Sequence, residues 1–385
     1  KDIPIAKYGK SNAGRMRHIY RVGLDYRYGR RMQAIAGIHF NYSLPKNFWE
    51  FGKELFPVTK NYPIDLRKNF IYLSLARNYL RFGWLILLLF GSSPACCKSY
   101  LPQRSSRFKS IMKNSLAAPY GTSLRMSDVG YKNKNQSHLK INFNSLEQYI
   151  DALIKAMNTP YPEYEAIGIY EEDNQIQLSA NLLQIENEYY SCIRPKGISL
   201  EGQRPTVSLQ QNGIDYIEMR SLDVNPFDPF GIERDCLLFC EIFLIFCLLE
   251  DSPLISDLEY EMLEYNELSV ALRGRQPNLT LLEDLNEKKN FIKDWSNDLL
   301  SKMVPIGEAL DSANHTNQYS QALRKQQNSV NNPDLLPSAK FHQLLIESNQ
   351  EYQDFNFDLA SKNVEQINEE YLAPDKIAYF ESVNN

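Results

Sequence analysis

Three features are absent from this 385-residue sequence, and each absence excludes a class of protein. The longest apolar runs, at 82–90 and 236–249, are shorter than the about 20 residues that cross a bilayer, so we expect no membrane partner. The six cysteines form no CxxC pair and no Cys/His metal spacing, which favours reduced thiols in a cytoplasmic protein. Basic residues do not gather in blocks, so no nucleic-acid partner is expected.

A starting methionine and a signal peptide are also missing. The chain begins Lys1-Asp2-Ile3-Pro4, and we therefore expect further residues before it in the natural protein. A P-loop of the form GxxxxGK[ST] is missing too, so phosphate binding would need another arrangement of groups.

The length allows one large domain, or a core with a helical appendage, and 43% hydrophobic residues provide a substantial core. The net charge of −5 is unevenly distributed: residues 1–110 contain 20 Lys and Arg against 5 Asp and Glu, and the remainder contains 22 against 42. Such a split indicates either an anion-binding half or two halves that pack on each other.

The most informative stretch is YIEMRSLDVNP, at residues 216–226. As a strand, it places Tyr216, Glu218 and Arg220 on one face, because residues two apart point to the same side. A carboxylate takes Mg²⁺ and a guanidinium takes phosphoryl oxygens, so the pair can hold a metal ion and a phosphate together. The alternative is an ion pair on a solvated face, which is common and weakly diagnostic.

Residues 33–44 alternate in the same way and predict a second strand. Its polar face carries Gln33, Gly37, His39, Asn41 and Ser43. A lone histidine more often has a structural role. However, a face made of Gln, His, Asn and Ser needs a partner for every polar group, and a ligand site would supply them.

The remaining pattern predicts an α+β protein with two parts. Residues 122–128 and 183–190 are expected to be strands, and 66–90, 146–157 and 233–250 helices. From Ser256 onward, amphipathic helices are expected at 256–273, 281–303, 306–327, 336–350 and 359–371. We therefore expect a core at 1–255 with a large, curved, mainly antiparallel sheet around a polar funnel, and a helical block at 256–385 packed on the same domain.

Seven segments together resemble the proteobacterial type of the glutamate–cysteine ligase (γ-glutamylcysteine synthetase) family. They are AKYGKSNAGR (6–15), AGIHFNYSLP (36–45), NYLRFGW (78–84), LFGSSPACC (89–97), TSLRMSDVGYKNK (122–134), LQIENEYYSCIRPK (183–196) and YIEMRSLDVNPFDP (216–229). Several long motifs in the family's order are far more specific than any single triplet. The similarity runs from residue 2 to about 280 and is looser beyond.

The resemblance implies a fold like that of glutamine synthetase and the first step of glutathione biosynthesis. ATP would phosphorylate the γ-carboxylate of glutamate, and the amine of cysteine would then displace phosphate. Mg²⁺ would screen the polyphosphate, and a protein cation would stabilise the transferring group. The implied partners are small molecules only, and we expect a monomer.

Carried over position by position, the resemblance implies His39 and Glu218 as metal ligands, and Arg220 as the arginine that faces the transferring phosphoryl group. The residues that match the amino-acid pockets are Tyr20, Leu24, Gln33, Arg125, Tyr131 and Tyr190. Arg194 and Lys196 are our own additional candidates for contact with nucleotide phosphates.

The sequence departs from the family in lacking an N-terminal part with a GxERE-type strand, which carries most of the Mg²⁺-binding carboxylates. One imidazole and one carboxylate match the metal cage here, whereas Mg²⁺ prefers about six oxygen ligands. Three interpretations stay open: a glutamate–cysteine ligase seen as a fragment, an inactive or partner-dependent remnant of that fold, and a ligase of the same fold with another amine substrate.

Overall fold

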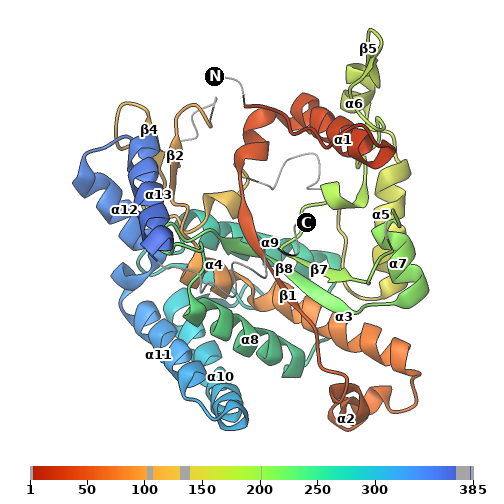
Figure 1. Cartoon of the computed structure of the whole chain (residues 1–385). Helices are drawn as coiled ribbons and strands as arrows, with labels where there is room; N and C mark the ends of the chain where they lie inside the picture. Colours follow the sequence, from red (N-terminus) through yellow and green to blue (C-terminus); the bar gives the residue numbers. More distant parts are fainter. Residues whose placement is uncertain (1–2, 102–106, 131–138, 201, 370–381, 383–385) are drawn as a thin grey trace.

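A three-stranded antiparallel sheet lies at the centre of the molecule (Figure 1). The computed structural model describes residues 3–101, 107–130, 139–200, 202–369 and 382. Within them β8 is the middle strand of this sheet, between β1 and β7. The three strands are β1 (Gly37–Tyr42), β7 (Ile193–Lys196) and β8 (Tyr216–Asp223).

Alternation along β8 decides which face of the sheet is buried. Ile217 and Met219 are fully buried and belong to the main apolar core, so Glu218 between them points to the opposite face. On the apolar side, α3 (Ile64–Phe82) and α4 (Trp84–Phe90) contact the sheet, and α8 (Arg234–Leu249) packs against α3 (Figure 1).

Helix α8 is apolar nearly all round because other helices surround it. Phe239, Phe243 and Cys247 are all completely buried, and α10 and α11 pack against this helix as well as α3. Burial of most of its surface accounts for the apolar run at 236–249, in which Leu237 and Leu249 remain exposed. Among the described residues, no single helix is long and apolar enough to span a membrane; α3 and α4 meet that test only as a pair, bent by 59°.

Helix α1 (Asn12–Tyr28) lies across from the exposed face of the sheet (Figure 1). Its first turn is capped by Ser11, whose hydroxyl accepts a hydrogen bond from the Gly14 N–H at 3.1 Å. The other helices are α2 (Phe48–Leu55), α5 (Leu146–Asn158), α6 (Pro162–Ile167), α7 (Pro205–Asn212), α9 (Asp257–Arg273), α10 (Ile292–Asn314), α11 (Gln318–Asn331), α12 (Pro337–Ser348) and α13 (Tyr352–Glu369).

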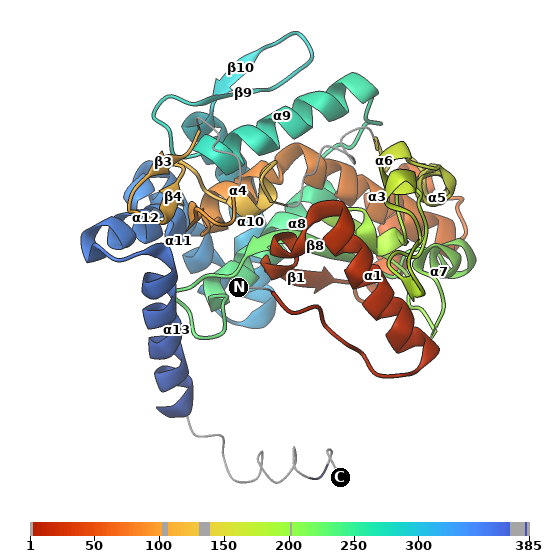
Figure 2. The ribbon, with the colours of Figure 1, turned by 90° about the horizontal axis from the view of Figure 1, so that it is seen from above.

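Short strands and 3₁₀ helices complete the described chain. In the view of Figure 2, α13 extends away from the body of the molecule, and the β9–β10 hairpin lies beside α9. The short strands are β2 (Ala95–Cys97), β3 (Lys109–Ser110), β4 (Ser115–Ala117), β5 (Tyr170–Glu171), β6 (Asn174–Gln175), β9 (Thr280–Leu282) and β10 (Lys289–Phe291). The 3₁₀ helices are η1 (Arg30–Ala34), η2 (Pro57–Thr59), η3 (Leu124–Met126), η4 (Glu186–Glu188) and η5 (Pro333–Leu335).

The expected α+β class with antiparallel pairing is confirmed, but the central sheet is smaller than the sequence suggested. Residues 122–128 contain η3 at Leu124–Met126 instead of a strand, and residues 183–190 form a loop with η4. In both segments alternate polar side chains turn back to bind the scaffold. Ser123 and Arg125, for example, both donate hydrogen bonds to one buried carboxylate, that of Asp223.

The C-terminal helices also differ in their boundaries. The predicted helix at 281–303 begins as the β9–β10 hairpin, and α10 then continues through Pro305, where a break was expected. Leu299, Leu300 and Met303 before the proline and Gly307 after it are buried, so continuous packing outweighs the hydrogen bond that proline removes. The main apolar core includes residues from both sides of position 255, such as Phe243 and Leu300.

Asp311 of α10 caps the next helix, and its replacement tests this packing. Its two carboxylate oxygens accept hydrogen bonds from the N–H groups of Tyr319 and Ser320, each at 2.9 Å. Burial opposes ionisation, but these hydrogen bonds outweigh it and lower the pKa of Asp311. Asp311→Ala should reduce the free energy of unfolding by about 1–2 kcal/mol at pH 7, measured by urea denaturation.

The pH dependence of this loss has a defined sign. A lowered pKa in the folded state gives stability that is present above the ordinary aspartate pKa of about 3.9 and is lost below it. The difference between wild type and Asp311→Ala should therefore shrink as the pH falls below about 4. Asp298→Ala, on an exposed position of the same helix, is the control; equal losses in both variants would contradict the capping role.

Candidate active site

A pocket of about 650 Å³ lies between α1 with η1 on one side and the exposed face of the central sheet on the other. Its lining is strongly cationic. The basic residues are Arg17, Arg21, Arg125, Arg194, Lys196 and Arg220, and among the described lining residues Glu218 is the only carboxylate. So many cations around one carboxylate favour an anionic ligand.

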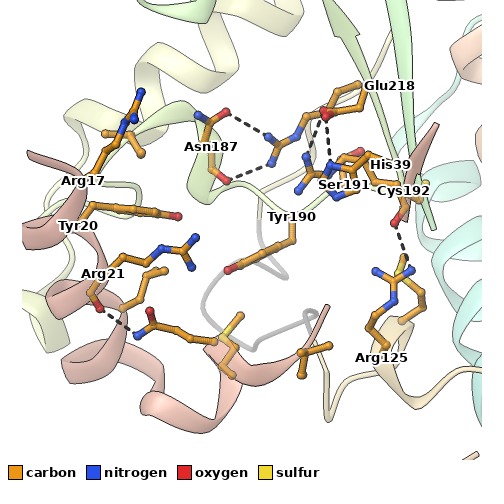
Figure 3. A pocket seen from close by; sticks show the side chains of 18 of the residues that line it. Arg17, Tyr20, Arg21, His39, Arg125, Asn187, Tyr190, Ser191, Cys192 and Glu218 are labelled. Carbon is orange, nitrogen blue, oxygen red and sulfur yellow. Dashed lines mark hydrogen bonds and ion pairs between the residues drawn. The ribbon is translucent and has the colours of Figure 1, made fainter. Parts of the chain in front are cut away.

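Glu218 lies at the centre of the sheet and is surrounded by three cationic or ionisable groups (Figure 3). Its Oε1 is 3.2 Å from His39 Nδ1, and its Oε2 is 3.1 Å from Arg220 Nη1 and 3.5 Å from Lys196 Nζ. Burial by itself would raise the pKa of Glu218. The hydrogen bond to His39 and the charges of Lys196 and Arg220 outweigh burial and hold the pKa well below its usual range.

The register of the sheet brings these groups together from distant parts of the chain. Asn41 of β1 and Arg194 of β7 lie opposite Glu218 on its two sides. Between the Ile38–Leu222 and Phe40–Met219 pairs, one residue of β1, His39, faces two residues of β8. This β-bulge at the middle of the strand pair lies where His39 meets Glu218.

The two further cations on β7 are partly desolvated. Burial lowers the pKa of Lys196, and the neighbouring charge of Glu218 partly restores it. Burial likewise lowers the pKa of Arg194, with Arg220 adding to the effect. Asn187 holds the guanidinium of Arg194 through its side-chain oxygen at 3.3 Å and its carbonyl at 3.2 Å. The buried Nε of Arg194 has no hydrogen-bond partner in the described part of the chain.

Arg125 lines the pocket, but its guanidinium is bonded to Asp223 and to two backbone carbonyls of β8. Arg125 Nε donates to Asp223 Oδ1 at 2.8 Å, and Nη2 donates to the carbonyls of Leu222 at 2.8 Å and Arg220 at 3.2 Å (Figure 3 shows the latter). Asp223 also accepts hydrogen bonds from the Ser123 hydroxyl, the Ser93 hydroxyl and the Ser92 N–H. The pair joins the end of β8 to two turns, at 91–94 and 122–127.

The other wall of the pocket is aromatic and comes from α1 and the loop after η4. Figure 3 shows the rings of Tyr20 and Tyr190 pointing toward the middle of the pocket. Burial raises the pKa of Tyr20, with the neighbouring Tyr190 and Glu188 contributing, so its hydroxyl stays protonated. Leu24 and Gln33 also line this wall, and the Gln33 amide donates to the Arg21 carbonyl at 2.9 Å.

All but one of the residues to which the sequence analysis gave a binding or catalytic role line this pocket, whereas Tyr216, Gly37, Asn41 and Ser43 of the two polar strand faces do not. The exception is Tyr131, which lies outside the described residues. Sequence reasoning missed Arg17 and Arg21, which lie one helical turn apart on α1. Within the described chain neither guanidinium makes an ion pair or a hydrogen bond. The i, i+4 spacing of these two arginines was the available signal.

The fold and the cationic pocket together favour a protein that binds anionic small molecules. A family model described as glutamate-cysteine ligase matches residues 1–270. The glutamate–cysteine ligase of Alcanivorax borkumensis is 43% identical over 93% of this chain and 69% of its own length. That of Hahella chejuensis is 40% identical over 99% of this chain and 72% of its own length. The chain belongs to the glutamate–cysteine ligase family.

Solved structures agree with this assignment. The crystal structure of glutamate–cysteine ligase from Francisella tularensis in complex with AMP has a TM-score of 0.88 and 34% sequence identity. The match covers 97% of this chain and 72% of that protein. A bifunctional glutathione synthetase from Pasteurella multocida, 21% identical with a TM-score of 0.65, shares the fold. The family expected from the sequence motifs is confirmed.

Removing the carboxylate of Asp223 tests how much of the site depends on it. Asp223→Ala would remove the carboxylate that pairs with Arg125, a residue that is 6% exposed, and so leave a buried positive charge without its Asp223 contact. The free energy of unfolding should fall by about 3–5 kcal/mol, measured by chemical denaturation. The double variant Arg125→Met/Asp223→Ala should recover part of that loss, because no buried charge is left unpaired. A double variant as unstable as Asp223→Ala would contradict this account.

Proposed function

We propose that the pocket is the active site for ATP-dependent ligation of the γ-carboxylate of glutamate to the amine of cysteine, the first step of glutathione synthesis. The observation that carries the proposal is the cluster of His39, Lys196 and Arg220 around Glu218 on one face of the sheet. In this cluster, Arg220 matches the arginine that faces the transferring phosphoryl group in the family, His39 and Glu218 match its metal ligands, and Lys196 is our own additional candidate.

We assign the sheet side of the pocket to the nucleotide. Arg194, Lys196 and Arg220 come from adjacent strands and present cations to one space, as triphosphate binding requires. The relative from Francisella tularensis in complex with AMP supports a nucleotide site in this fold. Arg220 is the proposed catalytic residue: its guanidinium faces the phosphoryl group in transfer, and Glu218 fixes its orientation at 3.1 Å.

We assign the α1 side to the amino-acid substrates. Tyr20, Leu24 and Tyr190 provide its aromatic and apolar surface, and Gln33 and Arg125 complete the lining. Arg17 and Arg21 have no carboxylate partner in the described chain, so they are our proposed partners for a substrate carboxylate. Because Arg125 is already bonded to Asp223, we propose that it chiefly shapes the floor between the two ends.

The family resemblance implies Mg²⁺, with His39 and Glu218 as its proposed ligands. The described residues do not form a Mg²⁺ site by themselves: no group of three or more His, Cys, Asp or Glu side chains converges within them. Mg²⁺ prefers about six oxygen ligands, and Glu218, the one carboxylate among the described lining residues, already contacts Lys196, Arg220 and the imidazole of His39. We therefore derive no catalytic step through the ion.

The residues of this chain can still perform part of the reaction. The cations of the sheet would bind the polyphosphate and neutralise charge on the phosphoryl group as it moves to the γ-carboxylate. The α1 wall would hold both amino acids in place and exclude water from the acyl phosphate, so that the amine, and not water, attacks. Charge stabilisation and positioning account for most catalysis in phosphoryl transfer.

Three broader assignments accompany this proposal. We propose a monomer in the cytoplasm, and all six cysteines are free thiols, as a reducing compartment would require. We also propose that the helical block at 256–385 supports the core at 1–255.

The second candidate function is a non-catalytic remnant that binds nucleotide or amino acid, which the lack of a metal cluster among the described residues favours.

Release of ADP by this 385-residue chain separates the two candidates. The chain is incubated with ATP, Mg²⁺, glutamate and cysteine, and each amino acid is omitted in turn. Release that requires both amino acids would support the ligase. No release, together with binding of ATP in calorimetry, would favour the remnant. Faster formation of γ-glutamyl-alanine than of γ-glutamylcysteine would overturn the substrate assignment.

Replacement of Arg220 tests the proposed catalytic residue. Arg220→Ala should lower turnover by at least about 10²–10³-fold with little change in the KM for either amino acid, because the lost interaction strengthens in the transition state. Steady-state kinetics measure the effect. Arg234→Ala, at an exposed position outside the pocket, is the control. Turnover near the wild-type rate in Arg220→Ala would remove this residue from the mechanism.

Replacement of Glu218 tests the proposed metal contact separately. Glu218→Gln keeps the shape of the side chain but removes its charge, so the variant should need a higher Mg²⁺ concentration for half-maximal turnover. A Mg²⁺ titration at fixed substrate concentrations measures it. An unchanged Mg²⁺ requirement would show that Glu218 serves only to orient Arg220 and Lys196.

A further inference from the structure

A completely buried ion pair lies behind the aromatic wall of the pocket and joins two segments far apart in the chain. Arg27 Nη1 of α1 is 3.0 Å from Glu188 Oε1 of η4, and both side chains are 0% exposed. Neither residue lines the pocket. A buried charge pair generally adds little net stability over an apolar pair of similar volume, so a role other than stability is worth examining.

The polar groups around this pair fix it in one geometry. Arg27 Nε donates to the Gln177 side chain at 2.9 Å, and Arg27 Nη2 donates to the Ser179 carbonyl. The guanidinium also stacks over the ring of Tyr164, 4.0 Å from its centre. Glu188 accepts hydrogen bonds from the Tyr28 hydroxyl at 2.9 Å and the Gln184 N–H at 2.7 Å.

The chain around Glu188 divides its side chains between the scaffold and the pocket. Glu186 and Glu188 turn inward, and Glu186 accepts a hydrogen bond from the Thr206 hydroxyl of α7 at 2.7 Å. Ile185 and Asn187, which alternate with them, line the pocket. The inward carboxylates therefore determine where the pocket-facing residues of this loop lie.

The same contacts hold α1 against the loop. The Gln184 amide reaches the Tyr20 carbonyl at 3.5 Å, and Gly23 lets α1 approach so closely that a Cβ there would lie 2.3 Å from the Gln184 side-chain oxygen. Tyr20, Arg21 and Leu24 project from α1 into the pocket, and Tyr190 projects from the loop. At the end of the pocket proposed for the amino-acid substrates, the lining residues of α1 and of the 184–190 loop thus both depend on the contact between these two segments.

We propose that the Arg27–Glu188 pair is a positioning device that sets the distance between α1 and the 184–190 loop, and thereby the affinity for the amino-acid substrates. The inference rests on the proposed function, in which this end of the pocket holds amino acids. Lys196, Arg220, His39 and Glu218 lie on the central sheet instead, and among the proposed nucleotide-binding cations Arg194 is the one that this loop contacts, through Asn187. The pair should therefore affect amino-acid binding more than ATP binding.

Glu188→Gln tests this role, because it keeps the side-chain shape and removes the charge. The KM for at least one amino acid should rise about tenfold or more, since displacement of a binding group by about 1 Å has effects of that size. The KM for ATP should rise less than the KM for the amino acid, because Lys196 and Arg220 stay on the central sheet and only the Arg194 contact passes through this loop. Glu259→Gln is the matched control: Glu259 pairs with Arg81 at 2.7 Å, with side-chain exposures of 19% and 12%, and neither residue lines the pocket.

A double variant separates positioning from stability. Arg27→Met/Glu188→Met leaves no unpaired buried charge, so its thermal midpoint should recover toward wild type. Its amino-acid KM should stay raised, because methionine cannot bond to Gln177, Ser179 or the Gln184 N–H. Recovery of both quantities together would show that the pair is merely structural and would overturn the proposal.

Amide hydrogen exchange gives a readout that needs no turnover. In Glu188→Gln, amides of residues 184–190 should exchange about tenfold faster or more, whereas Glu259→Gln should leave them unchanged. Unchanged exchange in Glu188→Gln would overturn the positioning role, whatever the activity. Wild-type protein that forms no γ-glutamylcysteine would instead count against the proposed function, so the two failures are distinguishable.

Discussion

The site depends on one carboxylate placed among cations at the middle of a three-stranded sheet. His39, Lys196 and Arg220 lie within 3.5 Å of Glu218. They come from the three strands of the sheet: His39 from β1, Lys196 from β7 and Arg220 from β8. Without this negative charge the cations of the pocket would repel one another in a partly desolvated space. The lowered pKa of Glu218 means that its carboxylate stays ionised through the physiological pH range. Lys196 and Arg220 are therefore held in one arrangement, from which both could also contact a bound polyanion.

Two other buried carboxylates extend the same principle to the walls. Asp223 holds Arg125 and two serine-containing turns, and Glu188 holds Arg27 and Tyr28. In both cases a buried carboxylate of the protein pairs with an arginine, Arg125 or Arg27. The sequence alone predicted a ligand contact for Arg125 and gave no role to Arg27. Among the described arginines that line the pocket, Arg17, Arg21 and Arg194 are those without a carboxylate partner. The number of cationic residues in a pocket therefore overstates how much anionic charge a ligand can bring, because some of these residues are already paired with carboxylates of the protein.

The sequence predicted individual strands and helices well because the repeat of side-chain direction along each element can be recognised from neighbouring residues. The shared face of Glu218 and Arg220, the alternation from Gly37 to Tyr42, and helix α8 all follow from periods of 2 and 3.6. The register that brings His39 and Lys196 to Glu218 joins residues far apart in sequence, and no local pattern contains it. The 122–128 segment alternated like a strand, yet Ser123 and Arg125 alternate because both reach Asp223 from a 3₁₀ turn. Likewise Arg27 and Glu188 stand 161 positions apart, which places their pairing beyond any single-sequence rule.

The β-bulge in the β1–β8 pair has a consequence for how this sequence can change over evolutionary time. Arg220 and Ser221 lie opposite the single residue His39, so the two halves of β8 follow different phases of alternation. Loss or gain of one codon on either strand here would shift the phase of everything beyond it and turn a guanidinium toward Tyr79 and Phe243 in the core. An insertion or deletion within β1 or β8 therefore reorients the side chains beyond it, whereas a change of length in the loops that connect the two strands leaves their register intact.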